Sequence, residues 1–376
     1  MTEAAFGHGP AGEERAAGGA TGPAASGDLG PADVPATGPT AGASGDAGSS
    51  ARSAGTAAEA SASAASAETP STDVLIVGGG PAGLSAALNL ARARASVVVV
   101  DTGRPRNAAT LRSHGFLTRD GISPIELRKL AREELRAYDG VRVLDRSAVA
   151  RIDADADGFV AALTGRAATA SPVLTARTVV VATGLGETLP DVPNLRAFYG
   201  MSIFSCAACD GWELQDEPVA LIGETSDLAD RARLLTRWTS HLTVCTNGAD
   251  VIDPVDEAEL VASGIVVERR VIADLAGERG QVAAVRFADG SSLAVAGGFV
   301  RPTWHAAHDF LDPLGPETDA EGHLITDRSG RTSVPGLYAA GDAAAPGPQQ
   351  LIVAAGQGAR VAAVLVQDLL GVRTAH

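Results

Sequence analysis

The chain has 376 residues, a net charge of −15 and an isoelectric point near 4.9. This acidic balance argues against a nucleic-acid partner, because binding a polyanion needs clustered lysines and arginines. Three cysteines in so long a chain exclude a disulfide scaffold, and a close cysteine pair is then expected to be redox-active or to bind a metal.

The first segment, residues 1–69, consists mostly of Ala, Gly, Ser, Pro and Thr with scattered acids. It has too few large apolar side chains to offset the entropy of ordering the chain, so we expect a disordered tail. It lacks the basic start and apolar core of a secretory signal, and no run of 18 apolar residues follows elsewhere. We therefore expect a cytoplasmic protein that does not enter a membrane.

A strand, a glycine turn and a helix are predicted next. The apolar run 74–77 predicts a buried strand, "GGGPAG" at 78–83 follows it, and a stretch with helical periodicity comes after the turn. A second buried strand, 97–100, ends on Asp101. This complete βαβ opening predicts dinucleotide binding, and the competing interpretation is a glycine turn without a ligand.

Each glycine of this turn has a separate physical role. Gly78 permits the tight turn, Gly80 lets a pyrophosphate approach the backbone, and Gly83 allows the helix to pack closely on the strand. Asp101 stands where an acid accepts hydrogen bonds from a ribose.

Further elements follow in alternation. Ser123 and Glu126 form a capping box that predicts a helix, and short strands are expected around 141–144, 159–163 and 178–182. A second α/β unit begins near Pro190. It contains a strand at 218–223, a helix at 226–238, a strand at 241–246 and a hairpin turning at Asp289 and Gly290. The last segment predicts a strand, a turn at Gly341 and Asp342, and a long Ala-rich helix.

Four motifs occur in an order that resembles the low-molecular-weight thioredoxin reductase-like flavoproteins: "GGGPAG", "VVATG", "CAACDG" and "GLYAAGD". The resemblance implies an α/β fold of two nested Rossmann-like dinucleotide-binding domains and a homodimer. The FAD domain would comprise residues 71–189 and 301–376, and residues 190–300 would form a smaller pyridine-nucleotide-type domain that carries the CxxC motif.

The resemblance also implies FAD as cofactor and a set of residues that bind it. Asp342 would contact the ribityl chain, and Gln350 would lie beside the isoalloxazine. For His114 a surface or core histidine is an equal alternative. The full set is Gly78, Gly80, Pro81, Ala82, Gly83, Asp101, His114, Val149, Gly341, Asp342 and Gln350.

The cysteine pair supplies the chemistry. Two cysteines separated by two residues can close to a small-ring disulfide, and one thiol of such a pair often ionises near neutral pH. By the resemblance, Cys209 is the thiolate against the flavin and Cys206 exchanges with substrate. Asp210 would be the acid/base residue that moves a proton as a thiol attacks or leaves.

A metal site is the competing explanation of the CxxC motif. It would require a second pair of ligands, which neither Cys245 nor His305 and His308 provide, so we expect no metal. Cys245 is predicted to be a small buried core residue. The two histidines are expected on neighbouring faces of a short helix or turn, where lining the substrate side is one possible role.

A second glycine fingerprint is damaged. Gly223 is retained, but Thr225 and Leu228 stand where small residues would let a pyrophosphate approach. The stretch "CTNGAD" after the next strand has no Lys or Arg to bind the 2′-phosphate of NADPH. We expect that this domain keeps its fold and has lost its nicotinamide ligand.

Without NADPH, the expected direction of electron flow is from a substrate dithiol through the cysteines to FAD and oxygen. The sequence resembles a dithiol oxidase branch of the family, which closes disulfides of holomycin-like and gliotoxin-like compounds, in its "GWE" and "TRWTS" stretches. That branch more often has His after the second cysteine, where this chain has Asp210. The alternatives are a disulfide reductase fed by NADPH or another donor, and a flavin-binding regulatory protein without catalysis.

Overall fold

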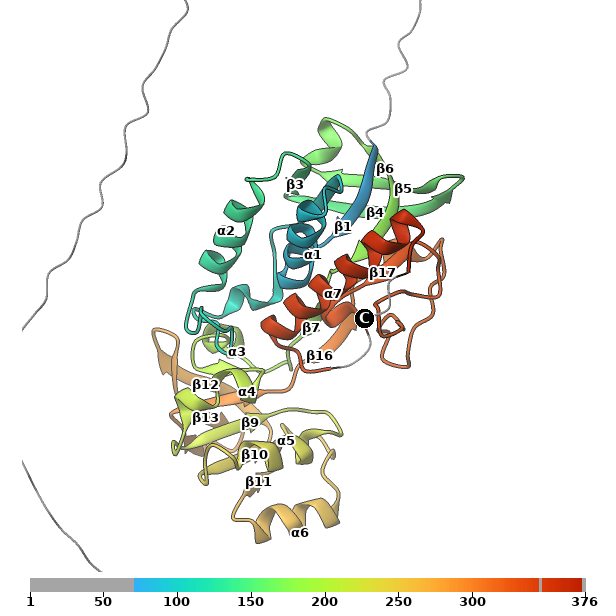
Figure 1. Cartoon of the computed structure of the whole chain (residues 1–376). Coiled ribbons are helices and arrows are strands. Elements are labelled where there is room, and N and C mark those ends of the chain that lie inside the picture. Colours follow the sequence, from blue (N-terminus) through green and yellow to red (C-terminus); the bar gives the residue numbers. More distant parts are fainter. Residues whose placement is uncertain (1–70, 345–346, 374–376) are drawn as a thin grey trace, which may run out of the picture. The chain divides into compact units, whose positions relative to one another are not determined.

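The structure is a computed structural model that describes residues 71–344 and 347–373 (Figure 1). The predicted disordered tail, residues 1–69, lies outside the described residues. The helices and strands named below carry the labels of Figure 1.

The first sheet has seven strands, in the order β3-β2-β1-β6-β5-β4, with β17 paired to β6. Parallel pairing joins β1, β2, β3, β6 and β17, whereas β4, β5 and β6 pair antiparallel. Because β17 adds to β6, the two ends of the described chain share one sheet. The strands are β1 (Ser71–Val77), β2 (Val97–Asp101), β3 (Val141–Asp145), β4 (Ser147–Asp155), β5 (Gly158–Gly165), β6 (Val173–Val181) and β17 (Leu337–Ala339).

Helices α1 (Pro81–Arg92) and α7 (Leu351–Leu370) lie side by side on this sheet, although they come from opposite ends of the described chain (Figure 1). Their contact is close, since a Cβ placed at Gly358 would meet the carbonyl oxygen of Ala82 at 2.0 Å. Within the described residues α7 is the one helix long and apolar enough to cross a membrane, with a mean hydropathy of 1.2. Part of its apolar face is buried against α1 in the hydrophobic core.

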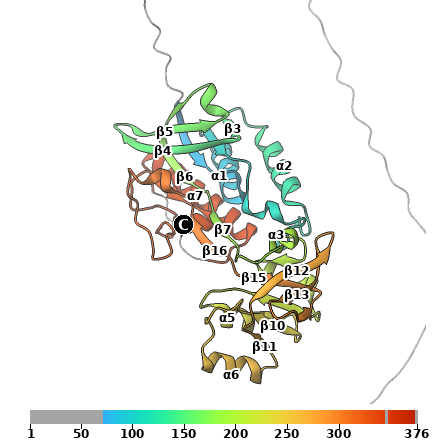
Figure 2. The ribbon, with the colours of Figure 1, turned by 180° about the vertical axis from the view of Figure 1, so that it is seen from behind.

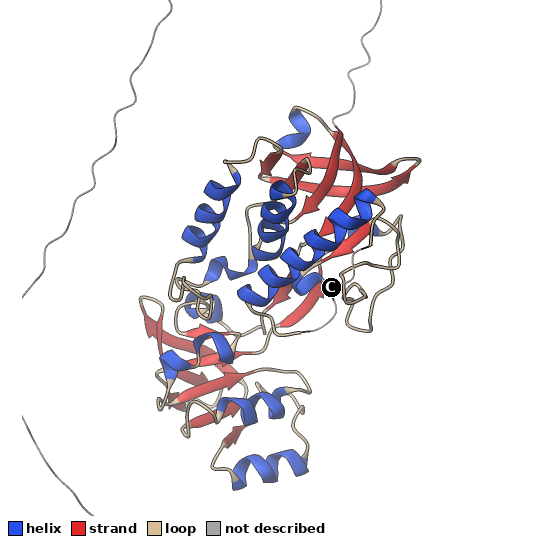
Figure 3. Cartoon of the chain, in the orientation of Figure 1, coloured by secondary structure: helices blue, strands red, loops and turns tan. Residues whose placement is uncertain are grey.

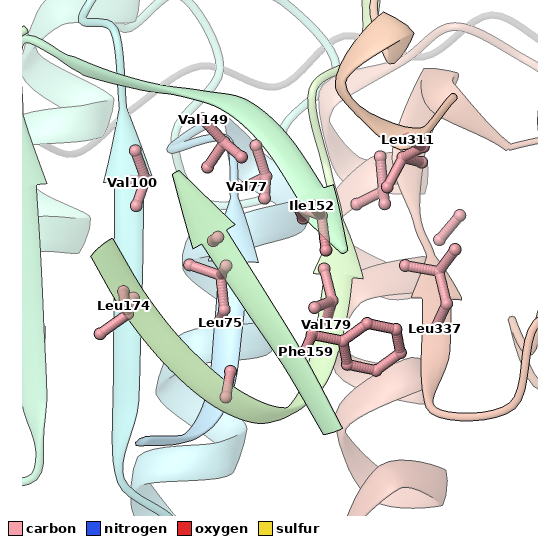
Figure 4. Close-up of a cluster of buried hydrophobic side chains, with 14 of the residues drawn as sticks. Leu75, Val77, Val100, Val149, Ile152, Phe159, Leu174, Val179, Leu311 and Leu337 are labelled. Carbon is pink, nitrogen blue, oxygen red and sulfur yellow. The ribbon is translucent and has the colours of Figure 1, made fainter. Parts of the chain in front are cut away.

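Strands β4 and β5 continue this sheet from β6 and fold over the other face of its parallel strands (Figure 2). Side chains of β1 and β2 pack there against Val149, Ile152 and Phe159 in one buried cluster (Figure 4). The central strands are therefore buried on both faces, which is why their sequences are continuous apolar runs.

The helix at α2 (Pro124–Leu135) begins as predicted, because the Ser123 hydroxyl accepts a hydrogen bond from the Glu126 amide at 3.4 Å. Leu127, Leu130 and Ala131 of this helix are half-buried, and Leu135 is buried. The remaining short helices are η1 (Arg106–Ala109), η2 (Ala167–Thr169), α3 (Leu195–Phe198), α4 (Ala207–Asp210), η3 (Trp212–Leu214), η4 (Asp309–Leu311) and η5 (Gly341–Ala343).

A second, five-stranded parallel sheet is ordered β11-β10-β9-β15-β8, and helices α5 and α6 accompany it (Figure 3). All of its strands fall between β6 and β17 in the chain, so this unit is inserted into the first one. The elements are β8 (Ile203–Phe204), β9 (Val219–Ile222), α5 (Leu228–Leu235), β10 (Leu242–Cys245), α6 (Pro254–Ala262), β11 (Val266–Glu268) and β15 (Gly297–Val300).

Two smaller sheets complete the described chain. The predicted hairpin at Asp289 and Gly290 is confirmed, because the strands on either side pair antiparallel. The strands are β12 (Ile272–Glu278), β13 (Gln281–Phe287) and β14 (Ser292–Ala294) in one sheet, and β7 (Leu185–Thr188) and β16 (Thr303–Ala306) in the other.

Two predicted elements differ from the structure. His305 was expected on a helix or turn, but it belongs to strand β16, because residues 303–306 find a partner in β7 that the sequence does not reveal. The helix expected at 226–238 is shorter, and α5 begins only at Leu228. The fold of two nested Rossmann-like units is confirmed, whereas the domain boundaries stay a prediction.

Candidate active site and cofactor cavity

A cavity of about 490 Å³ opens at the carboxyl ends of the first sheet's parallel strands. It is lined by residues from both ends of the described chain. Nine of the residues predicted to bind FAD line it, and Gly83 and His114 do not. Those that do are Gly78, Gly80, Pro81, Ala82, Asp101, Val149, Gly341, Asp342 and Gln350.

The glycines before α1 leave space in the cavity. Gly78 has a φ of +114°, and a Cβ there would meet the Ala182 carbonyl oxygen at 2.3 Å. A Cβ at Gly83 would meet the Gly78 carbonyl oxygen at 2.0 Å. This glycine therefore lets α1 pack closely against the preceding turn, and it does not line the cavity. A Cβ at Gly80 would meet nothing within 4 Å, which keeps the start of α1 open to a ligand.

The polar groups here fit the diphosphate of a dinucleotide. The first backbone amides of α1 have no partners within the helix, and the helix dipole favours negative charge at that end. Thr183 also lines the cavity, and its buried Oγ1 has no hydrogen-bond partner among the described residues. The cavity therefore offers donors that an anionic, oxygen-rich ligand would satisfy.

Asp101 lies at the end of β2 and is 6% exposed. Its Oδ2 accepts hydrogen bonds from Arg128, at 2.6 Å, and from Arg132, and its Oδ1 accepts one from the Gly103 amide at 3.0 Å. Burial opposes ionisation, but these donors together hold the pKa of this carboxyl below its ordinary value. Asp101 is thus a fixed anion on the wall of the cavity.

Asp342 lines the same cavity and is bound by Arg106. The Arg106 guanidinium donates to Asp342 Oδ2 at 2.6 Å and to Gln349 Oε1 at 3.1 Å. Burial raises the pKa of Asp342, and the positive charge of Arg106 opposes that rise. Arg106 also stacks on Trp304, with its guanidinium carbon 4.5 Å from the ring centre.

Cys206 and Cys209 are joined in a disulfide. Cys206 precedes the short helix α4, and both cysteines are half-buried. They do not line the 490 Å³ cavity, but a hydrogen-bonded bridge leads toward it. The Tyr199 hydroxyl donates to Oε2 of Glu187, a residue that lines the cavity, at 2.8 Å. The same hydroxyl lies 3.2 Å from the hydroxyl of Ser205, which directly precedes Cys206.

Asp210 follows the disulfide directly and has an unusual environment. Burial raises its pKa to about 7, the charge of His114 lowers it, and the charge of Glu213 raises it further. His114 Nε2 lies 3.5 Å from Glu213 Oε1, and His114 Nδ1 lies 3.7 Å from Asp120 Oδ2. The structure therefore places His114 beside the predicted acid/base residue and outside the cofactor cavity lining.

The second glycine turn, between β9 and α5, is filled by side chains. A Cβ at Gly223 would meet Leu228 Cδ1 at 2.7 Å and Arg301 Cβ at 2.9 Å. Asp227, which precedes α5, accepts hydrogen bonds from Arg301 Nε at 2.8 and 3.1 Å and from Arg231 Nε at 3.0 Å. An internal carboxylate thus stands at the helix start where a dinucleotide would place its diphosphate.

Of the three other candidate residues, the two histidines have hydrogen-bond partners and the cysteine is buried. His305 Nε2 lies 2.7 Å from the Thr188 hydroxyl, and His308 Nε2 lies 2.8 Å from the Gly322 carbonyl oxygen. Cys245 is fully buried on β10, as predicted, and burial raises the pKa of its thiol to about 12. A thiol with such a pKa is inert at neutral pH.

Sequence reasoning missed three residues of this region. Thr183 stands inside the "VVATG" motif, so the sequence did carry a signal for it. Arg106 and Tyr199 had none, because a loop arginine and a loop tyrosine obtain their partners only from the tertiary fold.

A cavity built for a dinucleotide and a CxxC disulfide together define an oxidoreductase that acts on thiols and disulfides. Residues 72–358 match the family described as pyridine nucleotide-disulphide oxidoreductase. The chain belongs to this family.

The relatives support a narrower assignment. A curated protein named thioredoxin reductase tcpT, from Claviceps purpurea, is 32% identical over 72% of this chain and 86% of its own length. The solved structure of HlmI is 33% identical, covers 80% of this chain and 93% of its own, and has a TM-score of 0.73. An oxidoreductase structure from Agrobacterium tumefaciens is 32% identical over 80% and 99%, with a TM-score of 0.72. The expected resemblance to thioredoxin reductase-like flavoproteins is confirmed, and FAD is the cofactor.

Proposed function

We propose that the protein is an FAD-dependent dithiol oxidase. It forms an intramolecular disulfide in a small-molecule dithiol and uses oxygen as the electron acceptor, with hydrogen peroxide as the second product. The observation that carries the proposal is the closed turn at Gly223, where the Asp227 carboxylate and its arginines stand at the start of α5. A second anion, the diphosphate of NADPH, would meet this carboxylate at close range.

The cysteines perform the exchange in two steps. A substrate thiolate attacks Cys206 Sγ, the bond to Cys209 breaks, and Cys209 leaves as a thiolate. The second substrate thiol then attacks the mixed disulfide, so that the substrate leaves oxidised and both cysteines are reduced. The residues that line the 490 Å³ cavity would hold FAD, which would supply an acceptor for the two electrons and two protons of the cysteine pair and a route from there to oxygen.

Asp210 and His114 are proposed to move the protons. A carboxyl with a pKa of about 7 can take a proton from a substrate thiol and return it to a leaving thiolate at neutral pH. His114 lies close enough to influence that pKa, although it is remote in the sequence. It would supply the imidazole that the related branch places after the second cysteine.

The other predictions remain part of this proposal. The residues lining the 490 Å³ cavity would bind FAD, and residues 190–300 would act as a carrier of the CxxC motif rather than as a nucleotide-binding domain. We place the enzyme in the cytoplasm as a homodimer, in the biosynthesis of a natural product or in self-protection from it.

A second candidate is an NADPH-dependent disulfide reductase. The names of curated relatives favour it. Thioredoxin reductase tcpT is 32% identical to this chain, and thioredoxin reductase sirT, from Leptosphaeria maculans, is 31% identical. The reaction would run in the opposite direction, from NADPH through FAD to the cysteines.

One experiment separates the two. The FAD-loaded protein is mixed without oxygen first with NADPH and then with a small dithiol such as a reduced dithiolopyrrolone, while the flavin absorbance is followed. We expect the dithiol, but not NADPH, to bleach the flavin, and oxygen to restore it with one hydrogen peroxide formed per dithiol.

The Cys206→Ser protein is the control, because it should keep its FAD and lose bleaching by the dithiol. Bleaching by NADPH within the turnover time of the wild type would overturn the oxidase proposal in favour of the reductase. Equal dithiol bleaching in the Cys206→Ser protein would remove the cysteine pair from the reaction altogether.

A further inference from the structure

Three side-chain oxygens connect the segment before the disulfide with the cofactor cavity. The Ser205 hydroxyl lies 3.2 Å from the Tyr199 hydroxyl, which in turn lies 2.8 Å from Glu187 Oε2. Ser205 directly precedes Cys206 in the chain, and Glu187 lines the 490 Å³ cavity. This row of oxygens therefore begins beside a cysteine of the disulfide and ends at the wall of the cavity.

The chemistry of the three groups sets the direction of their hydrogen bonds. An ionised carboxylate can only accept, so the Tyr199 hydroxyl donates its single hydrogen to Glu187. The Tyr199 oxygen is then free to accept the hydrogen of the Ser205 hydroxyl. Both hydrogen bonds point from the cysteine toward the cavity, which is the arrangement that can pass a proton in that direction.

Tyr199 is held firmly at the middle of the row. Its amide donates to the Leu195 carbonyl oxygen at 3.0 Å, and its ring packs against the buried cluster that contains Leu195 and Phe198. Burial raises the pKa of its hydroxyl, and the charge of Glu187 raises it further, so Tyr199 is neutral at pH 7. A neutral hydroxyl can accept a proton on one side and release its own on the other.

Glu187 is fixed by its strand and is free to take up a proton. It lies on β7, where its backbone pairs with Trp304 of β16. Among the described residues its carboxylate has no ion-pair partner, and Tyr199 is its side-chain donor. The charge of Arg106 acts on Tyr199, but the Arg106 guanidinium is bound to Asp342 at 2.6 Å. Protonation of Glu187 therefore breaks no salt bridge.

The cysteine chemistry requires a second proton acceptor. When two thiols close to a disulfide, two protons are released together with two electrons. The Asp210 carboxylate can bind one of these protons, as proposed above. The other needs a separate acceptor, because one carboxylate binds one proton.

We propose that Glu187 is this second acceptor and that the hydroxyls of Ser205 and Tyr199 relay the proton to it. The Cys206 thiol gives its proton to Ser205, Ser205 gives its own to Tyr199, and Tyr199 gives its own to Glu187. A thiol and a carboxylate thus become a thiolate and a carboxylic acid. The thiolate then closes the disulfide with Cys209, and the two electrons pass to FAD.

This inference rests on the proposed function for the role of the cysteines and of FAD. It does not depend on the direction of electron flow, because the same row returns the proton to Cys206 when the disulfide is reduced. The relay therefore serves the oxidase and the reductase alike.

The first test measures the transfer from the cysteines to the flavin. The FAD-loaded protein is mixed without oxygen with dithiothreitol, a small dithiol, at a concentration that no longer limits the rate of bleaching. Tyr199→Phe, Ser205→Ala and Glu187→Gln should each slow bleaching about 100-fold or more, because proton transfer by a positioned group is lost. Flavin absorbance per chain is measured beforehand, so that rates are compared for the loaded protein.

Tyr138→Phe is the matched control for Tyr199→Phe. The Tyr138 hydroxyl lies 3.1 Å from Arg92 Nη1, and Tyr138 does not line the cofactor cavity. Its rate of bleaching should equal that of the wild type.

The second test measures Cys206 without turnover. A phosphine keeps the FAD-loaded protein fully reduced, and alkylation of Cys206 by iodoacetamide is followed by mass spectrometry from pH 5 to 9. Tyr199→Phe should move the profile to higher pH, because the thiolate loses a donor of the row. Glu187→Gln should move it to lower pH, because a nearby negative charge is removed. Asp210 and Arg106, the other charged groups near the row, are the same in all proteins compared.

Three results would overturn the relay. Wild-type bleaching in Tyr199→Phe would leave the row without a role, and wild-type bleaching in Glu187→Gln would reduce Tyr199 to a support for Ser205. Alkylation profiles that move in the same direction in both variants would indicate distortion of the site. If dithiothreitol failed to bleach the wild type, the proposed function would fail instead, and the alkylation profiles would still decide on the relay.

Discussion

Two strand-turn-helix units of this molecule have the same topology and different contents. In the unit of β1 and α1, a side chain placed at Gly80 would meet only open space within 4 Å. In the unit of β9 and α5, the equivalent position is Thr225, whose hydroxyl donates to Asp227 Oδ1 at 2.6 Å, and Asp227 itself stands at the helix start. One turn is open to a ligand, and the other is closed by its own chain.

Under the proposed function, the difference means that a Rossmann-like topology does not by itself provide a nucleotide site. The side chains that enter the turn decide whether a diphosphate can approach. The Cys206–Cys209 disulfide is carried by the closed unit, whereas the open unit has the turn that we propose for the cofactor. On this proposal, one unit binds FAD and the other carries the reacting cysteines.

The largest expected effect comes from closing the open turn. Gly80→Val would place a branched side chain where the diphosphate approaches, so the affinity for FAD should fall about 100-fold or more through lost hydrogen bonds to the amides of α1. The fold should survive, because nothing within 4 Å opposes the new Cβ. Flavin absorbance per chain and the circular dichroism spectrum measure the two outcomes.

Gly356→Ala is the matched control for this variant. Gly356 is also free of neighbours within 4 Å and is exposed on α7, so an alanine there should leave FAD in place and stabilise the helix slightly. A Gly80→Val protein with full flavin content would contradict the assignment of this turn to the diphosphate.

The next effect concerns the chemistry of the closed unit. Asp210 must be ionised to accept a proton, and its pKa is about 7, so the rate of dithiol oxidation should fall as the pH drops below about 7. Asp210→Asn should reduce the rate about 100-fold or more and abolish this dependence. His114→Gln removes a charge that lowers the pKa of Asp210, so the pH profile should move to higher pH.

Rates of flavin bleaching by a dithiol, measured from pH 5 to 9 without oxygen, test both variants. His308→Gln is a suitable control, because His308 bonds to Gly322 and does not influence Asp210. A His114→Gln profile that coincides with the wild type would leave His114 without a role in proton transfer.

Much of the fold could be predicted from the sequence because its signals are local. The apolar run of β1, the turn at Gly78 and the following helix come from adjacent residues, and so does the hairpin at Gly290. The pairing of β16 with β7 could not be predicted, because its partners are more than 100 residues apart and short. The same reason hid the bond between Arg106 and Asp342.

The candidate site divides in the same way. The cysteines, Asp210 and the glycines were visible as motifs, and the damage at Thr225 and Leu228 was visible as a departure from one. What fills the damaged turn was not visible, because Arg301 reaches Asp227 across 74 residues of chain. His114 was predicted for the cofactor, and only the tertiary fold places it beside Asp210.

The smallest expected effect tests how the closed turn is held. Burial opposes ionisation of Asp227, but Thr225, Arg231 and Arg301 together lower its pKa, so its ionised form stabilises the fold above the ordinary carboxyl pKa. This contribution is lost as the pH falls through the lowered pKa. Because the side chain is 39% exposed, solvent screening keeps the effect small, and Asp227→Asn should lower the free energy of unfolding at pH 7 by about 1 kcal/mol.

Urea unfolding at pH 7 and at pH 3 measures this, and the difference between Asp227→Asn and the wild type should shrink at the lower pH. Asp230→Asn is the control, since Asp230 is 83% exposed and should change little. The Asp227→Asn protein should still fail to react with NADPH, because Leu228 and Arg301 continue to fill the turn at Gly223. If NADPH bleached the flavin of this variant, the charge of Asp227 alone would exclude NADPH from the closed turn, and the side chains packed at Gly223 would not contribute.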